Sequence, residues 1–140
     1  MRWKCKDIFA LSAVLMFMAL LCGAVLAGAG DADKGKRQYD QFCVPCHGKS
    51  GMGDGTRVNI EKLDPEPRNH TDGAYMNQRT DSELFKVIKN GGFSMNLSHE
   101  MPQWKHLLKE SDIWDVVAFV RTLADPPPNS DENKSAKDTD

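Results

Sequence analysis

Cysteine is scarce in this chain, which holds four copies among 140 residues. Two of them, Cys5 and Cys22, lie in the N-terminal segment, so only the pair Cys43 and Cys46 remains for a folded domain. No second cysteine pair, no His-x-His cluster and no alternation of strand and helix patterns accompanies that pair. These absences weigh against a zinc site and against a thioredoxin-like redox pair.

An excess of one charge is also lacking. Residues 31–124 hold 13 lysines and arginines against 14 aspartates and glutamates, so there is no basic stripe for nucleic acid. Four glycines between residues 48 and 55 lack the Lys-Ser/Thr ending of a phosphate-binding loop. The net negative charge is larger in residues 125–140, which hold 5 acidic residues and 2 lysines. Three consecutive prolines also lie in this segment. We predict that this acidic tail is disordered.

Residues 1–29 carry the features of an export signal. Basic residues at positions 2, 4 and 6 precede an apolar run over residues 8–27, and three small residues that follow resemble a signal-peptidase site. We expect cleavage after Ala29, with Ala27 as the second choice, and a periplasmic mature protein. The run is also just long enough, at roughly 20 residues, to span a bilayer. An uncleaved N-terminal membrane anchor is therefore the alternative.

The residues Cys43-Val44-Pro45-Cys46-His47 form a C-x-x-C-H motif. Two thiols three positions apart can each add across one vinyl group of a haem, while the adjacent imidazole lies under the iron as its proximal ligand. The motif therefore predicts one covalently bound haem c, attached through Cys43 and Cys46 and ligated by His47. Both thiols are then used, so we expect no structural disulfide.

Hydrophobic periodicity predicts one domain over residues 30–124, with three main helices. The first covers residues 33–42, the second opens on a capping box at Thr80 and stops at Gly91, and the third runs from about 111 to 123. Residues 48–80 are rich in glycine, proline, asparagine and aspartate, so we expect mainly loop, packed on the cofactor. A domain of this size buries a modest core, which the haem must complete.

Three features, in this order, resemble class I cytochrome c. They are Gly35 and Tyr39 ahead of the first haem cysteine, the C-x-x-C-H motif, and Met101-Pro102-Gln103-Trp104 before the final helix. The resemblance covers residues 31–124 and implies a small all-α class I cytochrome c fold, with three main helices and long loops wrapped around one haem. In that family the glycine lets the terminal helices cross closely, so Gly35 and Tyr39 should meet Phe119 or its neighbours.

The resemblance and the chemistry of the ligand favour Met101 as the distal iron ligand, because a thioether suits a low-spin electron carrier. The other interpretation is a core methionine that fills a gap beside the haem. Met95, six residues earlier, is the leading substitute. His99 and His106 flank Met101 and would give bis-histidine ligation, but we expect both to be solvated surface residues.

Three further residues are assigned to the haem site. A loop carbonyl that accepts the other N–H of the proximal imidazole would fix its tautomer and raise its basicity, and the resemblance assigns this carbonyl to Pro67. Arg68 is either the partner of a haem propionate, since a guanidinium matches a carboxylate, or an exposed side chain. Trp104 is expected to pack against the haem near the methionine loop, and packing in the protein core describes it equally well.

The sequence thus predicts an exported, monohaem c-type cytochrome that carries single electrons between a protein donor and a protein acceptor. It is expected to be a monomer and not an enzyme, and to meet a membrane only if the N-terminal segment stays uncleaved. Two alternatives stay open. One is a haem enzyme or gas-binding sensor with a labile sixth iron position, and the other is a membrane-anchored cytochrome c subunit of a larger redox complex.

Overall fold

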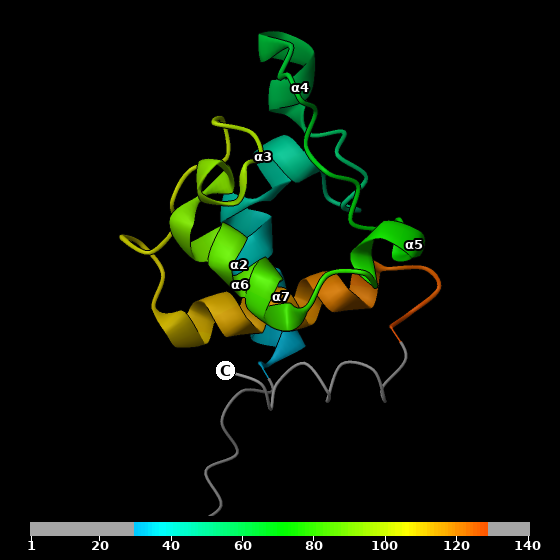
Figure 1. Cartoon of the computed structure of the whole chain (residues 1–140), viewed down its shortest axis with the longest axis vertical. Helices are drawn as coiled ribbons and strands as arrows, with labels where there is room; N and C mark the ends of the chain where they lie inside the picture. The colour runs from blue at the N-terminus through cyan, green and yellow to red at the C-terminus, as the bar shows by residue number, and fades with distance from the viewer. Residues whose placement is uncertain (1–29, 129–140) are drawn as a thin grey trace, which may run out of the picture.

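Helices joined by long loops make up the fold of residues 30–128, which a computed structural model describes (Figure 1). The elements are α2 (Ala32–Phe42), α3 (Val44–His47), α4 (Thr56–Glu61), α5 (Gly73–Met76), α6 (Asp81–Asn90), the 3₁₀ helix η1 (Gly92–Met95) and α7 (Glu110–Leu123). Within these residues strand-like pairing is limited to an isolated bridge between Asp72 and Asp125, and the all-α prediction is confirmed. No helix in the described range is long and apolar enough to cross a bilayer. The predicted export signal and its cleavage site lie outside the described residues.

Helices α2 and α7, the first and last of the described elements, cross in direct contact (Figure 1). A Cβ atom on Gly35 would lie 1.8 Å from the backbone oxygen of Asp115, so only glycine fits there. The fully buried Tyr39 ring meets Phe119 edge to face, with the ring centroids 5.1 Å apart. The predicted meeting of Gly35 and Tyr39 with Phe119 and its neighbours is therefore confirmed.

The hydrophobic core gathers on one face of α7. Its residues recur at helical spacing, so they share a face that turns toward α2 and α6. The buried members on this helix are Ile113, Val116, Val117, Phe119 and Val120. Leu84 and Ile88 of α6 and Tyr39 of α2 complete the same cluster.

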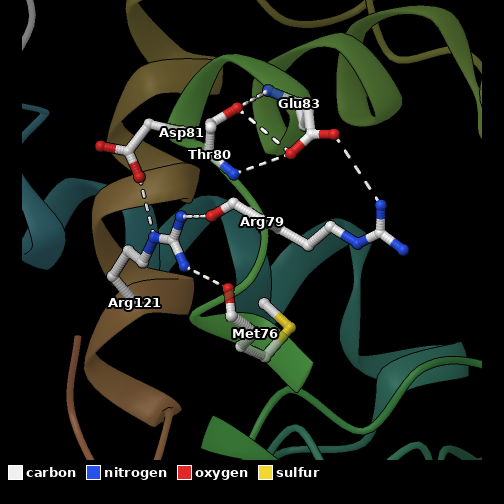
Figure 2. A network of polar contacts seen from close by, with 6 residues as sticks. All are labelled: Met76, Arg79, Thr80, Asp81, Glu83 and Arg121. Carbon is white, nitrogen blue, oxygen red and sulfur yellow. Dashed lines mark hydrogen bonds and ion pairs between the residues drawn. The ribbon is translucent and has the colours of Figure 1, made fainter. Parts of the chain in front are cut away.

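The guanidinium of Arg121 joins α7 to the end of the long loop and to the start of α6 (Figure 2). Its Nε donates to Asp81 Oδ1 at 2.8 Å, Nη1 donates to the backbone oxygen of Met76 at 2.6 Å, and Nη2 donates to that of Arg79. Only 10% of the Arg121 side chain is exposed. Charge-assisted hydrogen bonds in such a setting are strong, so this fork fixes the loop end on α7.

The capping box predicted at the start of α6 is confirmed. The backbone nitrogen of Thr80 donates to Glu83 Oε2 at 2.8 Å, and that of Glu83 donates to Thr80 Oγ1 at 3.2 Å (Figure 2). The outer helices begin one residue earlier than predicted. For α2 the reason is Asp31, whose carboxylate accepts from the backbone nitrogen of Lys34 at 3.0 Å and so caps the helix at Ala32.

The loop predicted over residues 48–80 also contains two short helices, α4 and α5, which the sequence pattern missed. An Arg57–Glu61 pair one turn apart supports α4. The Asp72 carboxylate accepts from the backbone nitrogen of Tyr75 at 3.1 Å and caps α5. Neither helix is long enough to show an apolar periodicity.

The folded domain continues beyond its predicted end at residue 124. The backbone nitrogen of Asp125 donates to the oxygen of Thr71 at 3.1 Å, and the Asp125 oxygen accepts from Gly73 at 3.2 Å. The side-chain amide of Asn77 donates to the oxygen of Pro126 at 3.0 Å. The start of the predicted tail is therefore bound to the long loop, and the tail prediction for residues 129–140 lies outside the described part of the chain.

Candidate functional site

All seven residues predicted for the haem site line one pocket between α2, α3, α7 and the two loops that precede α5 and α7. They are Cys43, Cys46, His47, Pro67, Arg68, Met101 and Trp104. Apolar side chains from the helices form much of the remaining wall, including Phe42, Val116 and Val120. The structure thus brings together residues that are up to 61 positions apart, from Cys43 to Trp104.

The C-x-x-C-H residues form a single tight turn directly after α2. Cys43 accepts at its backbone oxygen from the nitrogens of Cys46, at 3.1 Å, and of His47, at 2.8 Å. This turn places both free thiols and the imidazole on the pocket wall. Burial, with a smaller effect of Cys46, raises the pKa of the Cys43 thiol to about 12.

The imidazole of His47 is anchored through one ring nitrogen. Its Nδ1 lies 3.1 Å from the backbone oxygen of Arg68, so the Nδ1–H tautomer donates there and Nε2 stays available to a metal. The prediction that Pro67 supplies this carbonyl is wrong by one residue. The Pro67 oxygen instead lies against the backbone at Gly53, where a Cβ atom would be 2.4 Å away.

His70 also lines the pocket, although no role is predicted for it from the sequence. Its ring stacks on that of His47, with centroids 4.2 Å apart and an interplanar angle of 20°. Its Nδ1 lies 3.2 Å from the hydroxyl of Tyr39. Burial holds the pKa of His70 well below its usual value, and the neighbouring His47 adds to this effect. The signal in the sequence was a histidine two residues after Arg68, in the loop already assigned to the haem site.

Of the two candidate methionine ligands, Met101 lines the pocket and Met95 does not. Met101 is half-buried against the core, and its backbone oxygen accepts from the nitrogen of Gly92 at 3.1 Å. Met95 is the last residue of η1 and is not among the residues that line the pocket. His99 and His106 are exposed and lie outside the lining, as expected for surface residues.

Trp104 and Arg68 occupy different parts of the pocket wall. The Trp104 ring packs on Phe42 with centroids 5.3 Å apart, and its backbone nitrogen donates to the oxygen of Ile88 at 3.2 Å. Arg68 is exposed, and its guanidinium lies 4.0 Å from the centroid of the Tyr75 ring. The stacking keeps a positive charge at the pocket mouth, and pairing with a propionate stays a prediction.

The chemistry of these groups fits a haem. Two free thiols and a tautomer-fixed imidazole come from one turn, a thioether comes from the loop before α7, and the surrounding walls are largely apolar. Thiols at this spacing can form two thioether bonds, and nitrogen and thioether sulfur are axial ligands suited to haem iron.

Comparison with known proteins places the chain among cytochromes. The family described as "Cytochrome C oxidase, cbb3-type, subunit III" matches residues 30–120. A cbb3-type cytochrome c oxidase subunit CcoP from Azospirillum sp. (strain B510) is 26% identical over 97 residues, which are 69% of this chain but 30% of that protein. Cytochrome c-554(547) from Halothiobacillus neapolitanus is 30% identical over 95 residues, 68% of this chain and 99% of that protein.

Two solved structures share the fold. The KustC0563 c-type cytochrome superposes with a TM-score of 0.51 at 22% identity, over 64% of this chain and 96% of that one. A chain of the Kuenenia stuttgartiensis reducing HAO-like protein complex Kustc0457/Kustc0458 gives a TM-score of 0.56 at 29% identity, over 73% of this chain and 49% of that one. With the profile match over residues 30–120 and a relative matched over nearly its whole length, the chain belongs to the cbb3-type cytochrome c oxidase subunit III family and is a c-type cytochrome, an electron-transfer protein with covalently bound haem c.

Proposed function

We propose that this chain is a monohaem class I cytochrome c, exported to the periplasm, that carries single electrons between two redox proteins. His47 is the proximal and Met101 the distal ligand of its iron. The observation that carries this proposal is the shared pocket, which joins Cys43, Cys46 and His47 to Met101 and to no second methionine among the described residues. One C-x-x-C-H motif in the sequence supports one haem.

The residues of the chain set the properties of the site, while haem c supplies an iron that gains and loses one electron. The Arg68 carbonyl accepts the Nδ1–H of His47 and raises the basicity of that ligand. Met101 would supply a thioether as the second iron ligand, and such a ligand raises the reduction potential. The largely apolar lining of the pocket would limit the access of water to a bound haem, which favours electron exchange over chemistry at the iron.

Contact with the redox partners takes place at the pocket rim. Leu97 lines the pocket and is nevertheless 45% exposed, and Phe93, four residues earlier and outside the lining, is 65% exposed. Exposed apolar side chains at a site mouth suit a brief, partly hydrophobic contact with another protein. We propose that the chain acts as a monomer and does not itself catalyse a reaction.

Two alternatives are kept, and a specific observation favours the first of them. The chain spans 30% of the CcoP relative and 49% of the similar chain from the reducing HAO-like complex. This partial coverage favours the alternative that the protein is a subunit of a larger redox complex. N-terminal sequencing of the mature protein separates these readings, because a start near Gly30 removes the apolar anchor. A haem enzyme would need a labile sixth position, and a high-spin ferric spectrum would favour it over Met101 ligation.

The haem attachment itself is tested by staining. Full-length protein exported to the periplasm should give a haem-staining band on a denaturing gel, and the double variant Cys43→Ala, Cys46→Ala should give none. Deletion of residues 2–29 should also abolish staining, because attachment requires export. Normal staining of the double cysteine variant would contradict covalent attachment at these two residues.

A further inference from the structure

A second imidazole lies directly against the proposed proximal ligand. We propose that His70 is a positioning residue that fixes the plane of the His47 ring, and that Tyr39 holds His70 in place for this purpose. The inference rests on the proposed function, because it takes His47 to be the proximal ligand. It adds a residue that neither the C-x-x-C-H motif nor the axial pair includes.

The contact between the two imidazoles is a stack. Their centroids are 4.2 Å apart and their planes differ by 20°, so one ring covers the face of the other. His47 also has a hydrogen bond to the Arg68 oxygen, at 3.1 Å. A single hydrogen bond to a carbonyl tolerates a broad range of ring rotations, because the acceptor directions of the oxygen are broad. The stacked ring of His70 removes this freedom.

His70 is itself held from both its backbone and its ring. Its backbone nitrogen donates to the oxygen of Gly51 at 2.7 Å. Its Nδ1 lies 3.2 Å from the Tyr39 hydroxyl, which donates to it when neutral His70 carries its proton on Nε2. A Cβ atom on Gly51 would be 3.3 Å from that of His70, so the backbone at Gly51 passes close to the base of the His70 side chain.

Tyr39 connects this stack to the rigid part of the fold. Its side chain is fully buried, and its ring meets both His70, at 5.9 Å between centroids, and Phe119 of α7, at 5.1 Å. Phe119, Tyr39, His70 and His47 therefore form a continuous series of ring contacts from the α2–α7 crossing to the ligand. The orientation of the ligand plane is thus set by the helix crossing, through His70.

The test uses the full-length, haem-loaded ferric protein. In a low-spin ferric haem the spread of the haem-methyl proton NMR shifts and the EPR g anisotropy follow the orientation of the axial imidazole plane. We expect His70→Leu, which removes the stacked ring, to change the order or spread of the methyl shifts and the g anisotropy. Tyr39→Phe removes only the hydroxyl and should move the same signals in the same direction, to a smaller extent.

Two control variants separate positioning from stability. His99→Leu makes the same substitution at an exposed histidine outside the pocket, and Ile113→Val trims a fully buried core residue that does not line it. Denaturant unfolding should show a loss of stability in Ile113→Val, with the methyl shifts and g values unchanged. Both signals should also be unchanged in His99→Leu.

The outcomes divide clearly. Wild-type methyl shifts and g values in a loaded His70→Leu protein would overturn the inference, as would equal changes in Ile113→Val. If His70→Leu fails to load haem, the haem-methyl shifts and g values of Tyr39→Phe test the inference instead, and wild-type values in that variant would overturn it. A wild-type protein whose ferric haem lacks histidine ligation would instead overturn the proposed function, so failure of the two proposals can be told apart.

Discussion

The backbone of Gly35 on α2 lies against the backbone of Asp115 on α7, so close that a Cβ atom on Gly35 would be 1.8 Å from the Asp115 oxygen. The next atoms in its way, the carbonyl carbon of Asp115 and the nitrogen of Val116, also belong to the backbone. No side-chain rotation can relieve such a clash. This contact places Tyr39 one helical turn further along, where it meets Phe119 and the haem pocket.

Gly35→Ala should therefore destabilise the protein through the helix crossing. Forcing a methyl group into a packed site costs about 1–3 kcal/mol or more when the backbone must move. Denaturant unfolding of the haem-loaded protein, followed by far-UV circular dichroism, measures the loss. Arg37→Ala on the exposed side of the same helix is the control and should stay within about 0.5 kcal/mol of the wild type. Equal stabilities of the two variants would contradict the close crossing.

Arg121→Lys should loosen the long loop from α7, because lysine keeps the positive charge but lacks the three-donor fork. We expect the free energy of unfolding to fall by about 2–3 kcal/mol. Hydrogen bonds to a charged group contribute about 1.5–3 kcal/mol each, and the lysine ammonium can form some of the bonds that the guanidinium made. Hydrogen exchange at the amide of Asp125, which donates to Thr71 in the same loop, should quicken.

Arg79→Lys is the matched control for this fork. Its guanidinium lies 3.8 Å from Glu83 and is 41% exposed, and exposed pairs of this kind contribute about 0–1 kcal/mol. A loss in Arg79→Lys as large as that in Arg121→Lys would show that the fork in Figure 2 is not what fixes the loop.

Truncation after Pro128 tests whether the acidic end of the chain steers a partner. The removed residues 129–140 hold 4 acidic residues and 2 lysines, so the truncation makes the protein less negative. We expect unchanged spectra and midpoint potential, a modestly slower electron transfer with a basic redox protein, and a weaker dependence of that rate on ionic strength. Stopped-flow kinetics at several salt concentrations measures both. An unchanged rate and salt slope would exclude steering by this end.

Features that depend on near neighbours in the chain were predictable from the sequence. The capping box of Thr80 and Glu83 involves bonds between residues three positions apart, so its pattern is visible locally. The thiols and the imidazole of the haem motif share one turn for the same reason. The α2–α7 crossing came from the family resemblance, because nothing near Gly35 in the sequence reveals Asp115.

The features that the sequence did not predict depend on loop dihedrals and long-range contacts. Pro67 and Arg68 are adjacent, and which of their carbonyls faces His47 depends on the direction of the backbone at that point. The role of His70 depends on contacts with His47 and with Tyr39, 31 residues away, so the local sequence shows only a histidine in the haem loop. Helices α4 and α5 have six and four residues, too few for an apolar periodicity to show in the sequence, although Met76 of α5 is buried in the core.

The most direct test of the account is the axial ligation of the ferric protein. A methionine sulfur bound to ferric haem gives a weak far-red absorption band, and thioether ligation raises the midpoint potential. Met101→Ala should abolish that band and lower the potential, whereas Met95→Ala, at the residue outside the pocket lining, should leave both nearly unchanged. Loss of the band in Met95→Ala with its retention in Met101→Ala would contradict the proposed site.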